Sequence, residues 1–287
     1  MKWQSIEKLK RAGNCAINKS NMKSLEESVV TAMDGSDVAL FPFLPYILQD
    51  LWEIGASPKV IIGLVRKHTK NYSNLSVLDL GCGKGAVSIK LAKEFNCKCF
   101  GIDAIKEFID EANDKAREFG VDHLCQFAVD DIRERIKVLI RFDIIILGAI
   151  GPVFGDYHST LTILSQCLNK KGMIIIDDGY IENENDYSHP LIQKKEIILQ
   201  QIKDSGMRIV DEVIIAADKI KDSDDHIFEN LKKRCHELIQ IHPDKRGLFE
   251  NYIRKQEVEN DVLETKVVCS TMVIRKKFNV RRSKSEV

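Results

Sequence analysis

Three features are missing from this 287-residue sequence, and each absence excludes a class of function. Lysine plus arginine and aspartate plus glutamate both number 43, so a formal net charge of zero provides no overall field to attract nucleic acid or an acidic membrane. No run of eighteen apolar residues is present, so no membrane-spanning helix is expected. The first residues, Met1 to Ser5, lack the apolar core of a secretion signal.

A metal-binding or disulfide framework is also not expected. The eight cysteines are scattered, and several lie in apolar stretches that are typical of strands. This distribution favours reduced thiols in a cytoplasmic protein. Cys97 and Cys99 share one face of an expected strand, but no second Cys or His pair with ligand spacing lies nearby, so we predict no metal site.

The most informative segment runs from Val77 to Gly85. It is an apolar strand that carries one acid, Asp79, and it breaks into a turn with a glycine at every second position. Helical spacing follows over residues 86–95. Such a corner lets a ligand approach bare backbone and the free N–H groups of a helix end. The segment therefore predicts a nucleotide-binding site.

The acid in this corner indicates the kind of ligand. Gly81-x-Gly83-x-x-Ala86 formally satisfies a dinucleotide fingerprint, which keeps an NAD oxidoreductase as an alternative. Asp79, however, would face a doubly negative pyrophosphate in a partly dry site, which is unfavourable. A ligand without phosphate and with a cationic amine or sulfonium fits better, and S-adenosylmethionine has both groups.

The run from Asp79 to Gly85, Asp-Leu-Gly-Cys-Gly-Lys-Gly, resembles motif I of the class I S-adenosylmethionine-dependent methyltransferases. The similarity extends over about residues 75–180 and is to the small-molecule, ubiquinone-biosynthesis-like branch. It implies an α/β fold: a Rossmann-like, seven-stranded, mostly parallel sheet with helices on both faces. It also implies S-adenosyl-L-methionine as cofactor and in-line methyl transfer to a small-molecule acceptor.

Hydrophobic periodicity agrees with alternating strands and helices, which indicates a parallel sheet. Strands are expected at 75–80, 98–103, 126–129, 142–147 and 173–177, and helices at 105–119, 157–169 and 191–204. Two more strands, at 208–216 and 266–275, resemble the terminal antiparallel hairpin of the family. The charged helical block at about 222–264 is then an insertion in this hairpin, which caps the acceptor site or makes a homodimer contact.

The expected domain organisation has two parts. Residues 1–70 are predicted to form an N-terminal helical lid or cap, with helices at 23–33 and 57–68 and an aromatic segment, Phe41 to Tyr46, that folds over the acceptor loops. Residues 71–287 are predicted to form the S-adenosylmethionine-binding domain, including the insertion.

The resemblance implies roles for residues at the carboxyl ends of the first two strands. The glycine turn would lie under the methionine part and the ribose, and its residues are Gly81, Cys82, Gly83 and Gly85. Asp79 would hold the amino group. Asp103 would accept both ribose hydroxyls, a bidentate role that suits a carboxylate.

Further roles follow at the adenine and methyl ends of the cofactor. Ala104 and Ile105 would flank the adenine, and Asp131 with Ile132 would read its edge. Gly148 would let the backbone pass close to the sulfonium after the fourth strand.

The acceptor loops should follow the fourth and fifth strands, at 148–154 and 178–182. They lack the Asn-Pro-Pro-Tyr-like loop of the family's amino-methylating enzymes on nucleobases and glutamine, the cysteines of the RNA cytosine-C5 enzymes and the full acid set of the metal-dependent catechol-type enzymes. The candidate catalytic residues are Tyr157, Asp178 and Tyr180. An acid near the methyl group suits an amine acceptor, or serves as general base for a hydroxyl. N-, O- and C-methylation all stay open.

Two further alternatives remain. A basic stretch over residues 275–284 keeps an RNA or protein methyltransferase open, although zero net charge and the lack of an added RNA-binding module make nucleic acid an unfavoured partner. A catalytically inactive S-adenosylmethionine-binding protein is the other.

Overall fold

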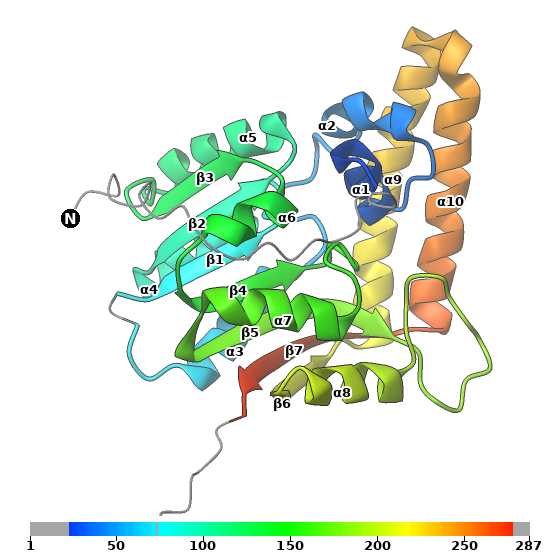
Figure 1. Ribbon diagram of the computed structural model, residues 1–287. Helices are drawn as coiled ribbons and strands as arrows, with labels where there is room; N and C mark the ends of the chain where they lie inside the picture. The colour runs from blue at the N-terminus through cyan, green and yellow to red at the C-terminus, as the bar shows by residue number, and fades with distance from the viewer. Residues whose placement is uncertain (1–22, 73, 278–287) are drawn as a thin grey trace, which may run out of the picture.

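The computed structural model of the protein describes residues 23–72 and 74–277. At its centre lies a seven-stranded sheet with helices on both faces (Figure 1). The strand order is β3-β2-β1-β4-β5-β7-β6. The strands are β1 Ser76–Leu80, β2 Lys98–Asp103, β3 Cys125–Val129, β4 Phe142–Gly148, β5 Leu168–Tyr180, β6 Met207–Ile214 and β7 Val268–Lys276.

Strands β1 to β5 run parallel, and β7 lies antiparallel between β5 and β6. The Rossmann-like methyltransferase fold expected from the sequence is therefore confirmed, including its terminal antiparallel strands. Chain order reverses between the neighbours β1 and β4, and in open α/β sheets ligands bind outside the carboxyl ends of the strands at such a point.

The two faces of the sheet are covered by different helices, because side chains alternate along each strand. Leu78 packs in one apolar cluster with α7 and α8, whereas Val77 packs in a second cluster with α3 and α4. The helices of the two faces are α3 Pro58–His68, α4 Ala86–Phe95, α5 Lys106–Glu118, α6 Ile132–Arg135, α7 Tyr157–Cys167 and α8 Lys195–Asp204.

Strand β5 is longer than the sequence indicated. It pairs with β7 from Ile174 to Tyr180, so it continues three residues beyond the expected end at Asp177. Because side chains alternate, Asp178 and Tyr180 lie on one face of the sheet and Asp177 lies on the other. Two of the three candidate catalytic residues are thus on a strand, where the neighbouring β7 holds their backbone in place.

The insertion between β6 and β7 forms two long antiparallel helices, α9 Ala217–Ile241 and α10 Arg246–Thr265, joined by a turn at Pro243–Lys245 (Figure 1). Helix α9 begins at Ala217, earlier than the expected start of the helical block at about residue 222. Its first turns carry the ion pairs Lys219–Asp222 and Lys221–Asp225, whose spacing supports a helix without an apolar stripe. Among the described residues, no helix combines the length and the apolar character needed to cross a bilayer.

The N-terminal segment packs against this insertion (Figure 1). It comprises α1 Leu25–Ala32, a 3₁₀ stretch Val38–Phe43 and α2 Leu44–Ile47. Leu44 and Ile47 are fully buried in a third apolar cluster with Leu238 of α9 and Phe249 of α10. The ring of Phe43 meets that of Phe249 edge-on at 5.1 Å. The aromatic segment is thus packed between the insertion and the sheet domain, and its role as a lid stays a prediction; residues 1–22 lie outside the described part.

Candidate active site

The turn between β1 and α4 presents bare backbone. Gly81 and Gly85 have φ of +71° and +75°, in the left-handed region that favours glycine. A Cβ at Gly81 would lie 2.5 Å from Ile150 Cγ2, and one at Gly85 would lie 2.8 Å from Phe127 Cζ. The N–H groups of Gly81 and Cys82 both donate to Ile102 O, at 2.8 and 3.0 Å. The turn is therefore hydrogen-bonded to the end of β2, and Gly81 and Gly85 have no room for larger side chains.

Two buried acids flank this turn. Asp79 of β1 is 3 % exposed and accepts a hydrogen bond from Ser88 Oγ at 2.7 Å. Burial raises the pKa of Asp79 to about 6, and the charge of Asp103 adds to the shift. Asp103, at the end of β2, accepts from the N–H groups of Gly83 at 2.8 Å and Ile105 at 2.9 Å. Asp103 therefore joins the glycine turn to the start of α5, and burial raises its pKa as well.

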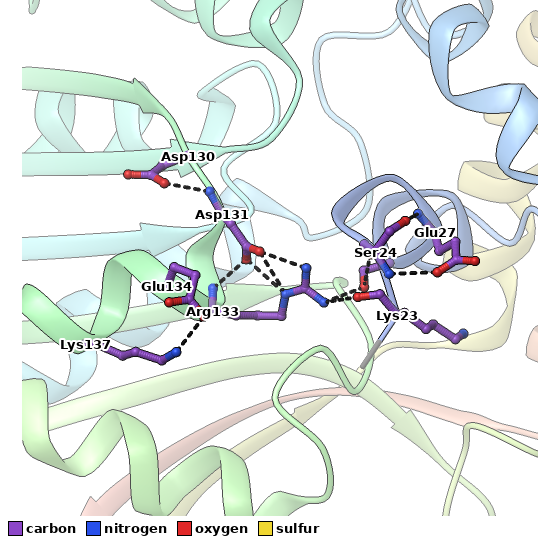
Figure 2. Close-up of polar contacts among 9 residues, drawn as sticks. Lys23, Ser24, Glu27, Asp130, Asp131, Arg133, Glu134 and Lys137 are labelled. Carbon is purple, nitrogen blue, oxygen red and sulfur yellow. Dashed lines mark hydrogen bonds and ion pairs between the residues drawn. The ribbon is translucent and has the colours of Figure 1, made fainter. Parts of the chain in front are cut away.

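Asp131, at the end of β3, is bound to an arginine (Figure 2). It caps α6 by accepting from Arg133 N at 2.8 Å, and its carboxylate also accepts from Arg133 Nη2 at 2.8 Å. Burial alone would raise the pKa of Asp131, but the hydrogen bonds and charge of Arg133 outweigh burial and lower the pKa. Arg133 Nη1 donates to Lys23 O and Ser28 Oγ, both at 2.9 Å. This arginine thus connects the end of β3 to α1.

The remaining residues predicted to contact the cofactor lie around the same edge of the sheet. Ala104 is partly exposed and follows Asp103, whereas Ile105 is buried in the third apolar cluster. Ile132 begins α6 and packs in the core against β4 and α7. Gly148 ends β4 where Ala56 approaches so closely that a Cβ at Gly148 would lie 2.8 Å from Ala56 Cβ. The strand ends therefore bring the predicted set to one edge.

Of the three candidate catalytic residues, two are in contact. Tyr157, at the start of α7, donates its hydroxyl to Asp178 Oδ2 at 2.9 Å, and Asp178 Oδ1 accepts from Gly179 N at 2.8 Å. Burial raises the pKa of both side chains, and the charge of Asp178 raises that of Tyr157 further. Tyr180 is 2 % exposed, packs in the apolar core, and accepts from Lys195 Nζ at 3.0 Å. It is separate from the pair.

A cavity of about 2260 Å³ opens at the carboxyl edge of the sheet. Its floor is the loop after β4 and the end of β5, including Ile150, Asp177 and Asp178. Its other walls come from α1, α3, α6, the end of β6 and the insertion helices α9 and α10. The cavity therefore lies between the sheet and the helices that pack above it.

The walls of this cavity combine apolar, acidic and basic side chains; the basic ones are Lys23, Lys59, Lys67, Arg133, Lys137 and Lys219. The apolar residues include Ile150, Val153, Leu191, Ile214 and Ile227, and the acids include Asp34, Asp177, Asp178, Asp224 and Glu259. Burial raises the pKa of Asp34, Asp177 and Asp224 to about 6, and neighbouring carboxylates add to each shift. Within the described ranges, no group of three or more His, Cys, Asp or Glu side chains is arranged to hold a metal ion.

Sequence reasoning did not find three of these acids. Asp34, Asp224 and Glu259 lie in segments that the sequence indicated only as a break and as charged helices. In sequence they look like ordinary solvated charges, and no spacing distinguishes them. The raised pKa values of Asp34 and Asp224, and the contact of Glu259 Oε2 with His189 Nε2 at 3.3 Å, result from packing between segments that are far apart in the chain.

Comparisons with known proteins agree with this geometry. A family model described as a methyltransferase domain matches residues 71–240. The chain is 47% identical over 51 residues to the release factor glutamine methyltransferase of Buchnera aphidicola, covering 17% of this chain and 18% of that protein. It is 26% identical over 119 residues to the uncharacterized methyltransferase YcgJ of Bacillus subtilis, covering 42% and 46%. The matches therefore span less than half the length of these curated relatives.

The fold has solved counterparts. An S-adenosylmethionine-dependent methyltransferase from Geobacter sulfurreducens, in complex with S-adenosyl-L-homocysteine, superposes with a TM-score of 0.65 at 15% identity. That superposition covers 80% of this chain and 96% of the other. Because the methyltransferase-domain model covers more than half of the sequence, the chain belongs to that family.

Proposed function

We propose that this methyltransferase acts on a small-molecule acceptor held in the cavity at the carboxyl edge of the sheet. The cavity itself is the observation that carries the proposal. Ligand pockets usually have volumes of about 300–1,000 Å³. A cavity of about 2260 Å³ therefore has room for a small-molecule acceptor, and the residues proposed below to hold the cofactor lie outside its lining. Its floor includes Ile150, which also lies against Gly81 of the glycine turn.

For the cofactor we propose the corner formed by the ends of β1, β2 and β3. The glycine turn fits because a Cβ built at Gly83 would have no other atom within 4 Å, so the backbone there is open to a ligand. Asp79 would hold the amino group and Asp103 the ribose hydroxyls. Ala104 and Ile105 would flank the adenine, Asp131 and Ile132 would read its edge, and Gly148 would face the sulfonium. When bound, S-adenosylmethionine supplies the electrophilic methyl group.

The cavity walls favour an acceptor with an apolar body and a basic nitrogen. Ile214 and Ile227 offer an apolar surface. Asp34, Asp177 and Asp224, each with a pKa of about 6, are ionised at neutral pH and favour a cation. Asp178, held by Tyr157, is placed to take a proton from an amine before it attacks. N-methylation is therefore the reaction that the acidic part of the wall, around Asp177, Asp178 and Asp224, supports best.

A methyl-transfer screen tests the proposal. Purified protein is incubated with isotope-labelled S-adenosylmethionine and three matched acceptor series, apolar amines, phenols and carboxylic acids, and the formation of S-adenosylhomocysteine is followed by mass spectrometry. We expect turnover with amines. Turnover with phenols or acids alone contradicts the amine assignment, and turnover only with RNA or protein contradicts the small-molecule assignment. Cofactor binding without turnover on any acceptor supports an inactive binding protein.

We also propose a cytoplasmic location for the protein. The seven cysteines of the described part are free thiols, which suits the reducing cytoplasm. Association into a homodimer stays a prediction, which light scattering of the purified protein tests.

A further inference from the structure

Lys84 lies inside the glycine turn, yet its side chain is only 1 % exposed. A buried ammonium is costly unless it is paired and hydrogen-bonded. Its Nζ forms an ion pair with Glu111 of α5 at 2.8 Å, and it donates to Leu48 O at 2.9 Å and Gln49 O at 3.4 Å. The charge in the turn is thus bound to the backbone of the N-terminal segment.

The main chain of the same residue makes a second connection. Trp52 Nε1 donates to Lys84 O at 3.0 Å. The Trp52 ring is itself held by Phe119, at 5.1 Å between ring centres, and by Lys90 Nζ, 5.0 Å from the ring centre. Residues 48–52 are therefore attached to the glycine turn through both the side chain and the carbonyl of Lys84.

The opposite side of the N-terminal segment is attached to the insertion. Asp50 accepts two hydrogen bonds from Arg234 of α9, at 2.6 Å from Nε and 2.7 Å from Nη2. Glu237, one turn further along α9, accepts from Tyr46 Oη and from Arg234 Nη1, both at 2.8 Å. Such bidentate charged pairs fix both position and orientation. The same helix carries Asp224 and Ile227 to the wall of the cavity.

We propose that Lys84 is a positioning residue that couples the glycine turn to α9, so that a cofactor bound at the turn orders the helix over the acceptor cavity. The connection runs from Lys84 through residues 46–52 to Arg234. This coupling rests on the proposed function in one respect, because it assumes that the cofactor binds at the glycine turn. By linkage, an acceptor held under α9 would in return tighten cofactor binding.

Hydrogen–deuterium exchange of the full-length protein tests this coupling, with saturating S-adenosylhomocysteine as the probe. In the wild type we expect slower exchange at 79–85 and also at 44–52 and 217–241. For Lys84→Met we expect binding about tenfold weaker or more, the range for lost hydrogen bonds to a charged group. At saturating S-adenosylhomocysteine, amide exchange in this variant should still slow at residues 79–85 but no longer at residues 217–241. Lys93→Met, an exposed lysine on α4, is the matched control and should behave as the wild type.

A second variant separates coupling from a purely structural role of Lys84. Asp50→Ala breaks the contact with Arg234 and leaves the turn intact. It should bind S-adenosylhomocysteine within about twofold of the wild type, since Asp50 is partly exposed and its side-chain hydrogen bonds in the described structure go to Arg234 and not to the turn. The slowing at 217–241 should nevertheless decrease. This variant also decides the question if Lys84→Met does not fold.

Two results would overturn the proposal while leaving the proposed function intact. In the first, calorimetry shows that the wild type binds S-adenosylhomocysteine, but amide exchange slows only at residues 79–85. In the second, amide exchange at residues 217–241 slows in Asp50→Ala as much as in the wild type. No binding of the probe to the wild type would instead reject the cofactor assignment, and the coupling with it.

Discussion

The proposed cofactor corner and the acceptor cavity are built by the chain in opposite ways. The corner uses the ends of β1, β2 and β3, which follow one another along the chain with α4 and α5 between them. Its main contacts are short-range or between adjacent strands, such as Asp103 with the N–H groups of Gly83 and Ile105. Its chemistry is therefore a property of a local motif placed on a regular scaffold.

The cavity, in contrast, takes its walls from segments spread from α1 to β7. Asp34 follows α1, Asp177 lies within the central strand β5, and Asp224 lies on α9. These acids come together only when the N-terminal segment packs on the insertion. The comparison teaches that the cofactor can be recognised from a short motif, whereas acceptor specificity depends on long-range packing. The following predictions, from the largest effect to the smallest, test this division.

The largest effect is expected at the glycine turn. Gly81→Ala combines left-handed backbone, which costs about 1–2 kcal/mol for other residues, with a Cβ placed 2.5 Å from Ile150 Cγ2. Together we expect S-adenosylhomocysteine binding at least about 100-fold weaker, roughly 3 kcal/mol, by calorimetry. The control is Gly120→Ala, with a similar φ of +69° and open space around it. If both variants bind equally well, the turn does not hold the cofactor.

Asp103→Ala should come next. It removes the acceptor of the Gly83 and Ile105 N–H groups and the proposed partner of the ribose hydroxyls. We expect a loss of about 1.5–3 kcal/mol in binding of S-adenosylmethionine and S-adenosylhomocysteine alike, since the ribose is common to both. Asp114→Ala, on the exposed face of α5, is the control. A loss for only one of the two ligands would argue against a ribose contact.

A smaller effect, confined to turnover, is expected at the end of β5. Tyr157→Phe leaves the buried Asp178 without the hydroxyl that it accepts from at 2.9 Å. Because Tyr157 acts on the base only through its hydrogen bond to Asp178, we expect kcat with an acceptor from the screen to fall about 100-fold, the lower end of the usual contribution of a positioned acid or base. Cofactor affinity should not change. The control is Tyr72→Phe, because the Tyr72 ring stacks on Phe95 away from the cavity. If Tyr157→Phe binds the cofactor more weakly, the acceptor cavity and the cofactor corner do not act separately.

The smallest effect concerns stability and pH. Asp224 has a pKa of about 6 in the fold and an ordinary value of 3.8, so between these values the folded state binds more protons than the unfolded state. Its contribution to stability therefore falls as pH rises from about 4 to about 6. Because asparagine does not titrate, Asp224→Asn should not lose this stability as pH rises.

We expect urea unfolding to show Asp224→Asn more stable than the wild type by at most about 1 kcal/mol at pH 8, because the site is partly exposed, and little different at pH 4. Asp225→Asn, whose carboxylate pairs with Lys221, is the control and should show no gain. If Asp224 serves acceptor binding, the stabilised variant should also lose methyl transfer to amines. If Asp224→Asn is more stable but still methylates amines, Asp224 does not contribute to acceptor binding.

Local signals in the sequence predicted much of the fold and the family. The start of α3 at Pro58 follows from Ser57-Pro58, although the Ser57 side chain makes no cap hydrogen bond. The apolar run that became β4 indicated a strand buried on both faces. The motif at Asp79 to Gly85 predicted the methyltransferase family, which the comparison over residues 71–240 confirms. These signals are readable because a turn, a helix start or a buried strand depends on neighbours in the chain.

Other features had no such signal. The continuation of β5 through Tyr180 depends on pairing with β7, which lies across the insertion. Lys84 lies between two glycines, and the sequence indicated no role for it. Only the fold shows that its charge is buried against Leu48 O and Glu111. The aromatic segment around Phe43 was expected over the acceptor loops, and the structure places it between the insertion and the sheet domain.

The sequence by itself thus determined the strand–helix alternation, the glycine turn and the family, because periodicity and backbone conformation are local properties. Tertiary structure alone decided which acids meet at the cavity, how α1 is attached to Arg133, and where the charge of Lys84 goes. Burial and electrostatic interactions act through space. The same aspartate is an ordinary solvated charge on an isolated helix and an acid with a pKa near 6 where α1, α9 and α10 pack together.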